Sequence, residues 1–174
     1  MCCRYYFEKD VHPNDEALIF HADGQEKMRW GFPAQQQGSI KQSSFAGLII
    51  NARAESVLEK RTFSESLLRR RCVIPAEKFY EWDRQKMKNT FRRIDQQMIY
   101  MAGFYAISAN EKRFVIITTD ANESMRPVHD RMPLILEAAQ IDDWIHDPNK
   151  VRDYLRWRPL ELERRADYEQ MSFF

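Results

Sequence analysis

The feature that most constrains the fold is a series of short segments rich in β-branched and aromatic residues. Each segment is three to eight residues long and is bounded by Gly, Pro, Asn or Asp, which is typical of β-strands. The segments are 4–7, 48–50, 72–74, 79–82, 98–105, 114–118 and 134–136. They outnumber the helical segments and do not alternate with them. This pattern predicts an α+β fold with a mainly antiparallel sheet.

Helical signals are fewer, and they fall in three places. Thr62 and Glu65 have the spacing of a capping box, which predicts a helix through 66–69. Segment 138–145 places its apolar residues on one helical face. Asp147 followed by proline predicts an N-cap and a helix that continues to Trp157.

The length of the chain fits one domain, which we expect to span 1–174. At this length folding buries roughly 70% of the surface of the unfolded chain, so a core forms without disulfides or metals. The polar stretch 34–44 is predicted to be a loop inside this domain, because no repeat or linker composition accompanies it. We expect a monomer.

Charge and apolar patterning argue against several classes of protein. Twenty-seven Lys and Arg against 26 Asp and Glu give a net charge of +1, so any basic surface must come from local clustering. The longest apolar run, 98–107, has ten residues, and a membrane-spanning helix needs ~20. The N-terminus does not resemble a secretory signal, and three cysteines, two of them adjacent, make a poor disulfide framework; a cytoplasmic location is expected. The Cys and His residues lack zinc-ligand spacing, and we expect no metal or cofactor.

Cys2 is the first candidate for a reactive residue. Removal of Met1 would give residue 2 an α-amine with a reference pKa of about 7.7–8.0 beside a thiol with one of about 8.5. The amine of such a 1,2-aminothiol condenses with an aldehyde, and the thiol then closes a five-membered thiazolidine ring. The alternative is an inert cysteine at a frayed chain end, since chain termini are commonly disordered.

Two further segments place polar side chains at the ends of predicted strands. Asn51 and Arg53 follow an apolar strand; Asn offers a donor and an acceptor, and Arg suits phosphate or carboxylate. The alternative there is an Asn turn with a solvated arginine. Glu81 lies between Tyr80 and Trp82, where partial desolvation would raise the pKa of a carboxyl towards the range useful for acid–base catalysis. The alternative is a glutamate that faces water on an edge strand.

His129 stands in a loop bracketed by prolines before an apolar strand. Histidine is the usual proton shuttle near pH 7, and the nearby Arg131 is suited to a phosphate contact. A structural histidine is the alternative. Trp30, followed by Gly, Phe and Pro, offers an aromatic platform for a base, against the alternative that it belongs to the core.

Basic residues also cluster at 69–71, 92–93 and 164–165. The first cluster follows a predicted helix, where cations interact favourably with the C-terminal end of the helix dipole. A structural role is therefore favoured for that cluster.

Taken together, the motifs resemble one known family. In chain order they are Met-Cys-x-Arg, Trp-Gly-Phe-Pro, Ile-Asn-Ala-Arg-x-Glu, Cys-x-x-Pro followed by Phe-Tyr-Glu-Trp, and His-Asp-Arg-Met-Pro-Leu-Ile-Leu. They run from Cys2 to Leu136, about three quarters of the chain, and this order resembles the SRAP family (SOS response-associated peptidases).

This resemblance implies a distorted antiparallel β-barrel with peripheral helices and a positively charged groove for single-stranded DNA. It also implies a covalent cross-link to the aldehyde of abasic sites. Cys2 would be the nucleophile after the protein removes its own Met1, and Asn51 would hold the open-chain sugar. Glu81 and His129 would be the acid–base pair. The residues implied in DNA binding are Arg4, Trp30, Arg53, Arg61 and Arg131.

The sequence departs from the family pattern at several positions. Cys3 stands where glycine is usual, which places a second thiol beside the nucleophile. Glutamines at 35–37 stand where the family often has tryptophans that wedge against bases, and the usual C-terminal ending is missing. These departures predict a smaller DNA footprint.

Two other functions compete with cross-linking. One is a cysteine peptidase in which Cys2 is the nucleophile and His129 the base. The other is a non-covalent binder of single strands in which Cys2 is incidental.

Overall fold

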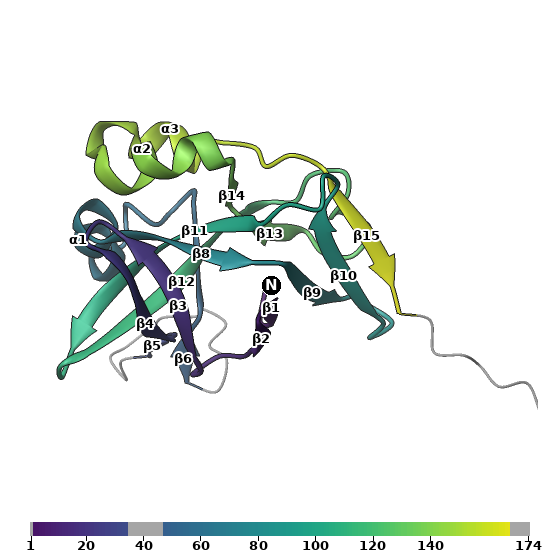
Figure 1. Cartoon of the computed structure of the whole chain (residues 1–174), viewed down its shortest axis with the longest axis horizontal. Coiled ribbons are helices and arrows are strands. Elements are labelled where there is room, and N and C mark those ends of the chain that lie inside the picture. Colours follow the sequence, from purple (N-terminus) through teal and green to yellow (C-terminus); the bar gives the residue numbers. More distant parts are fainter. Residues whose placement is uncertain (1, 35–46, 168–174) are drawn as a thin grey trace, which may run out of the picture.

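The computed structural model describes residues 2–34 and 47–167, so the loop predicted at 34–44 lies, apart from Ala34, outside the described residues. Five strands pair in a closed ring (Figure 1). In order around the ring they are β12 (Glu111–Asp120), β4 (Gly24–Trp30), β3 (Glu16–His21), β8 (Arg71–Ala76) and β11 (Ile99–Ser108). Every neighbouring pair is antiparallel except β12 with β4. The prediction of an α+β fold built on a mainly antiparallel barrel is confirmed.

A glycine allows the ring to close. At Gly103, β11 pairs with Cys72 of β8 on one edge and with Ile116 of β12 on the other. A Cβ atom at this position would lie 2.5 Å from both the Ile74 side chain and the Val115 carbonyl oxygen. The close approach of three strands therefore requires a residue without a side chain.

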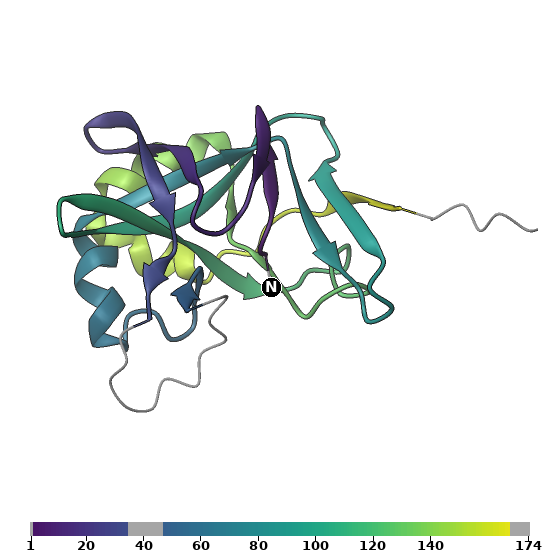
Figure 2. The same ribbon diagram turned by 90° about the horizontal axis from the view of Figure 1, so that it is seen from below.

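A second sheet lies beside the barrel and carries the N-terminus. Figure 2 shows its dark purple N-terminal strands between the barrel and the rest of this sheet. Its order is β15 (Leu162–Ala166), β10 (Lys88–Arg93), β9 (Lys78–Trp82), β1 (Tyr5–Phe7) and β2 (Lys9–Val11), and all pairs are antiparallel. Tyr5, Phe79 and Phe91 are fully buried in the same core cluster as Ile19 and Phe114 of the barrel. The two sheets thus share one core.

Short strands complete the architecture. β7 (Asn51–Arg53) runs parallel to β12, while β13 (Arg131–Pro133) and β14 (Ile135–Leu136) pair with β12 and β11. β5 (Phe32–Pro33) and β6 (Leu48–Ile49) form a separate pair.

The helices cover the barrel. They are α1 (Arg61–Arg69), α2 (Ile141–His146) after the 3₁₀ turn η1 (Ala138–Gln140), and α3 (Val151–Leu155) after the 3₁₀ turn η2 (Pro148–Lys150). α1 packs on β11 and α2 on β8 (Figure 1). None of the helices in the described part of the chain is long and apolar enough to span a membrane.

The helix signals were partly right. Asp147 accepts a hydrogen bond from the Asn149 backbone N–H at 2.9 Å, which confirms the predicted N-cap, although α3 ends at Leu155, short of Trp157. The prediction of a capping box at the start of this helix is wrong. α1 begins at Arg61 after an N-cap at Lys60 that makes no side-chain cap, so Thr62 and Glu65 lie inside the helix.

Arg71, in the first basic cluster, joins two helix ends. Its guanidinium donates to the carbonyl oxygens of Leu67 and Leu68 at the end of α1 and of Trp144 and Ile145 in α2. These carbonyls lie in the last turns, where intrahelical donors are missing. The structural role predicted for this cluster is confirmed at Arg71.

Replacing Arg71 with Met should lower the free energy of unfolding by about 2–4 kcal/mol, because several buried carbonyls lose a charged donor. Urea denaturation followed by circular dichroism measures this loss. Arg69→Met is the control, since Arg69 is exposed on α1, and it should change stability by less than about 0.5 kcal/mol. Equal effects of the two substitutions would contradict the capping role.

Candidate active site

Cys2 is buried in the protein core. Its side chain is 1% exposed, and it belongs to the core cluster shared by the two sheets. Asn51, in β7, donates a hydrogen bond from Nδ2 to the Cys2 carbonyl oxygen at 2.9 Å. The alternative of a frayed chain end is therefore wrong for Cys2.

The environment of Cys2 holds its thiol in the protonated form. Burial, reinforced by the negative charge of Glu81, raises the pKa of the Cys2 thiol well above its ordinary value. The Sγ atom lies 4.0 Å from the Arg4 carbonyl oxygen, its hydrogen-bond acceptor. Cys3 is half-buried, and burial followed by Glu81 also raises the pKa of its thiol. Besides burial, the carboxylate of Glu81 therefore raises the pKa of both thiols.

Asn51 and Arg53 differ in their surroundings. Asn51 is 8% exposed and lies within β7, so the alternative of an Asn turn is wrong. Its Oδ1 atom is buried and makes no hydrogen bond to the described residues. Arg53 is exposed two residues later. The strand thus presents a buried acceptor oxygen beside Cys2 and a cation at the surface.

Glu81 faces the protein interior from β9. It alternates with Tyr80 and shares the inner face of the strand with Phe79, and its exposed fraction is only 3%. Burial raises the pKa of its carboxyl above the ordinary value. The desolvated carboxyl predicted from the sequence is confirmed, and the alternative of a water-facing glutamate is wrong.

His129 lies in the turn before β13, with two neighbours at its Nδ1 atom. The backbone N–H of Arg131 and the Asp130 Oδ1 atom are both 3.0 Å away. The Arg131 N–H donates to Nδ1, so a neutral ring carries its proton on Nε2, whereas the Asp130 contact is an ion pair only when the ring is charged. Burial lowers the pKa of the imidazole, which favours the neutral ring.

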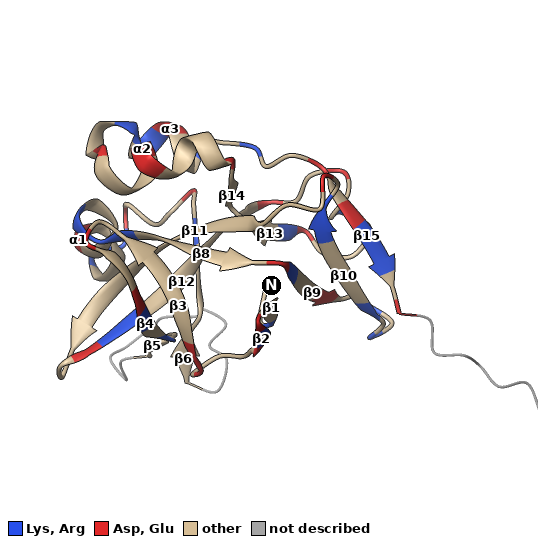
Figure 3. Ribbon diagram, in the orientation of Figure 1, with Lys and Arg blue, Asp and Glu red and all other residues tan. Residues whose placement is uncertain are grey.

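The predicted DNA-binding arginines fall into two groups, and Figure 3 shows basic and acidic residues interspersed over the fold. Arg131 is 8% exposed and makes a bidentate ion pair with Glu55 as well as a contact with Asp120. Arg4 donates to Asp10 at 2.6 Å and lies over the Tyr80 ring. Arg53 and Arg61 are exposed.

Sequence reasoning missed the carboxylate partners of two of these arginines. Asp10 belongs to none of the motifs recognised in the sequence. Glu55 is the last residue of the Ile-Asn-Ala-Arg-x-Glu motif, and this position could have indicated that its carboxylate bonds to an arginine.

The prediction of Trp30 as a platform for bases is wrong. Its side chain is 0% exposed, packs against Tyr5 and Phe114, and donates from Nε1 to the Ile50 carbonyl at 2.9 Å. A large apolar ring with one satisfied donor is stabilised in the core. Trp30 therefore belongs to the core, which was the alternative interpretation of the sequence.

An open pocket of about 550 Å³ borders the site. It is lined by the turn after β9 and by the loop that carries His129, including Trp82, Arg84, Arg126 and Asp130. Trp82 directly follows Glu81, and His129 lines the same pocket. The pocket therefore lies beside both catalytic candidates. No group of three or more metal-ligating side chains gathers among residues 2–34 and 47–167.

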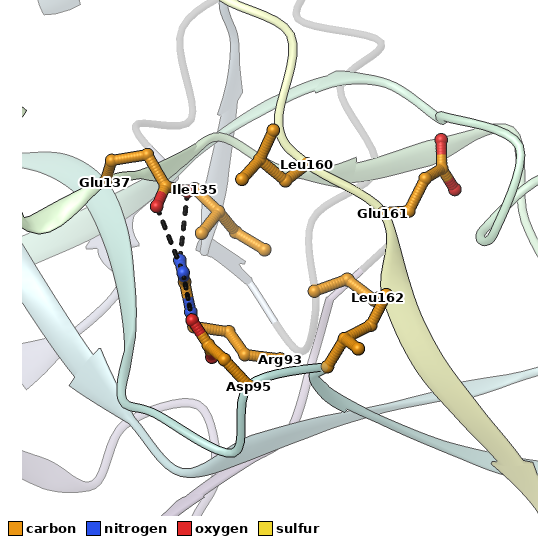
Figure 4. A pocket seen from close by; sticks show the side chains of 8 residues that line it. Arg93, Asp95, Ile135, Glu137, Leu160, Glu161 and Leu162 are labelled. Atoms are coloured by element: carbon orange, nitrogen blue, oxygen red, sulfur yellow. Dashed lines mark hydrogen bonds and ion pairs between the residues drawn. The ribbon is translucent and has the colours of Figure 1, made fainter.

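A second pocket, of about 290 Å³, lies between β10, β14 and β15 (Figure 4). Arg93 is the one cation among its described lining residues, and its guanidinium is bonded to Asp95 and Glu137. The rest of the lining is mainly apolar, with Ile135, Leu160 and Leu162. This pocket therefore offers no available positive charge to a phosphate.

The family assignment rests on the whole length of the sequence. Residues 1–170 match the sequence model of the family described as SOS response associated peptidase (SRAP). The chain belongs to this family. Among SRAP relatives, abasic site processing protein YoaM of Bacillus subtilis is 33% identical over 160 residues, which cover 84% of this chain and 69% of that protein. Abasic site processing protein YoqW of the same organism is 33% identical over 183 residues, or 97% and 80% of the two chains.

A more distant relative and two solved structures are also similar to this chain. Abasic site processing protein HMCES of Xenopus tropicalis is 26% identical over 168 residues, covering 80% of this chain and 48% of that protein. Crystal structures of proteins from Bacteroides thetaiotaomicron and Bordetella bronchiseptica each superpose with a TM-score of 0.74 at 22% identity. They cover 91% and 92% of this chain, and 77% and 87% of their own. At this identity the likeness shows the fold.

Glu81→Gln should stabilise the protein relative to wild type by more at pH ~7 than at pH ~4. Because burial raises the pKa of Glu81 in the folded state, the folded chain holds this proton more tightly than the unfolded chain. The stability that results is full below the ordinary pKa and is lost as the pH rises through the raised one. Urea unfolding at the two pH values measures the difference.

Glu65→Gln is the matched control, because Glu65 is exposed on α1. Its effect on stability should be the same at both pH values. A Glu81→Gln difference that does not grow with pH would show that the carboxyl is not desolvated.

Proposed function

We propose that this chain processes abasic sites in single-stranded DNA by forming a thiazolidine between Cys2 and the ring-opened deoxyribose, after removing its own Met1. The observation that carries the proposal is the burial of Cys2 beside Asn51 and Glu81. The names of the SRAP relatives, which are abasic site processing proteins, support it.

The covalent steps balance without an added cofactor. Hydrolysis of the Met1–Cys2 peptide bond consumes one water, releases methionine and leaves the α-amine of Cys2. The α-amine of Cys2 attacks the aldehyde carbon of the abasic site, and the carbinolamine loses water to form an imine. The Cys2 thiol then adds to the imine carbon, and its proton passes to the nitrogen. The product is protein plus DNA less one water. Because amine and thiol share one Cα, the second step is intramolecular and benefits from a high effective concentration.

Opposite pKa shifts suit Glu81 and His129 to opposite proton transfers. Burial raises the pKa of Glu81, which favours the protonated acid that delivers a proton to the departing hydroxyl. Burial lowers the pKa of His129, which favours a neutral imidazole. The neutral imidazole is the form that can accept a proton from the attacking amine.

Asn51 supplies the contact to the sugar. Its Nδ2 group is bonded to the Cys2 carbonyl, while Oδ1 is a buried acceptor without a partner among the described residues. A buried polar atom without a hydrogen bond costs about 1–3 kcal/mol, so a sugar hydroxyl that donates to it would be bound favourably. Arg53 and Arg61 are exposed and suited to phosphate, whereas Arg4 and Arg131 would have to share their guanidinium groups with carboxylates.

The raised pKa of the Cys2 thiol argues against a cysteine peptidase that cleaves other proteins with Cys2 as its nucleophile; the proposed removal of Met1 is a hydrolysis by water and does not use a Cys2 thiolate. A peptidase nucleophile needs a thiolate, which a lowered pKa favours. In thiazolidine formation the amine attacks first, so a protonated thiol at rest does not block the reaction.

Cys2→Ala should abolish covalent capture of a single-stranded oligonucleotide that carries one abasic site. It should leave binding of the same strand within a few-fold, because the backbone contact from Asn51 remains. Intact mass spectrometry of untagged protein detects the adduct and also reports whether Met1 is absent. Cys3→Ala is the matched control and should still form the adduct. A stable adduct with Cys2→Ala would rule out the mechanism, and binding without an adduct in wild type lacking Met1 would favour the non-covalent binder.

An N-terminal extension before Cys2 should also abolish capture, because the amine becomes an amide and cannot form an imine. The measurement is the same mass shift, made with the extended protein and again after protease cleavage exposes Cys2. Capture should return after cleavage. Equal capture before and after would show that the α-amine takes no part.

A further inference from the structure

The outer face of the second sheet carries aromatic and basic side chains in direct register. Paired residues on antiparallel strands project to the same face. Tyr6 pairs with Lys78, Tyr80 with Thr90, and Trp82 with Lys88. Arg92 lies two residues after Thr90 on the same side of β10. We call this surface the Tyr80 face, and it consists of Tyr6, Lys78, Tyr80, Trp82, Lys88, Thr90 and Arg92.

Cations converge on the Tyr80 ring. The Lys88 Nζ atom lies 4.9 Å from the ring centroid, the Arg4 guanidinium carbon 5.2 Å, and the Lys78 Nζ atom 5.9 Å. Lys78 is also 4.7 Å from the Tyr6 ring. The negative faces of the rings partly offset the repulsion between these like charges.

Carboxylates neutralise only part of this charge. Arg4 pairs with Asp10, and Lys88 pairs with Asp167 at 2.9 Å. Lys78 and Arg92 make no ion pair within the described residues. In Figure 3 the basic residues recur along β9, β10 and β15. Glu163 of β15 lies directly opposite Arg92 and interacts with it electrostatically, so Arg92 is partly compensated and Lys78 is not. The cations on and around this face still outnumber its carboxylates, and a polyanion would relieve the repulsion between them.

We propose that the Tyr80 face binds the phosphodiester backbone of the DNA strand that flanks the reacting nucleotide. The face is continuous with the candidate site, because Trp82 belongs to both the face and the pocket beside His129. Tyr80 is 5% exposed beneath its cations, so the contact is with phosphates rather than by base stacking. The choice of DNA rests on the proposed function, while the charge of the face does not.

The test compares two double variants of equal charge. Lys78→Gln with Arg92→Gln removes the two cations of the face that make no ion pair within the described residues, and Lys27→Gln with Arg69→Gln removes two exposed cations from β4 and α1. Fluorescence anisotropy measures binding of a single-stranded oligonucleotide without an abasic site over a salt series. Each lost phosphate contact lowers the slope of log affinity against log salt by about 0.7, so the first variant should lose about 1.4 and bind about tenfold more weakly at ~0.1 M salt.

The control variant should bind within about twofold of wild type, since exposed charges beyond a Debye length are screened. Equal losses in both variants, or an unchanged slope in the first, would overturn the proposal. Lys78→Arg with Arg92→Lys keeps both charges and should keep the slope, which separates loss of charge from loss of folding.

Capture of abasic DNA separates this proposal from the proposed function. The Lys78→Gln, Arg92→Gln variant should reach full adduct at saturating DNA, because the reacting groups are intact. Wild-type protein that binds DNA with the expected slope but forms no adduct would overturn the cross-linking mechanism alone.

Discussion

The hydrogen bond from Asn51 to the Cys2 carbonyl fixes the N-terminal segment to the barrel. Asn51 is held in β7 by its parallel pairing with β12, and the residues that follow Cys2 enter β1 between β9 and β2. A chain end normally gains entropy by fraying. Here pairing on both edges of β1 and burial of Tyr5 hold it in place, so a reactive residue near the terminus acquires a defined surrounding.

Burial is then the common cause of the chemical character of the site. A low-dielectric surrounding disfavours charge in every group, and so it raises the pKa of acids and lowers that of bases. It raises the pKa of Cys2 and Glu81 and lowers that of His129. One physical effect therefore shifts the thiol, the carboxyl and the imidazole towards their uncharged forms.

The predicted strands include those buried on both faces as well as the partly buried β1, β6 and β9. β8, β11 and β12 have continuous apolar runs, whereas β4, β10 and β15 have mostly polar residues on the solvent side and were missed. The site residues could be proposed because the motifs that contain them follow one another in the order that resembles the SRAP family. The burial of Cys2 could not be predicted, since it depends on pairing between segments far apart in the chain, such as residues 5 and 79.

The near-zero net charge does not show that the individual cations have different roles. Arg71 caps helices, and the buried Arg131 is bonded to the exposed carboxylates of Glu55 and Asp120. Arg92 and Arg93 are neighbours in β10, but alternation sends one to the Tyr80 face and the other to Asp95 and Glu137. A basic cluster in the sequence thus splits into Arg93, which is bonded to carboxylates, and Arg92, which makes no direct ion pair within the described residues. The charge that can attract a polyanion is therefore set by the pairing of the strands, and it cannot be read from composition.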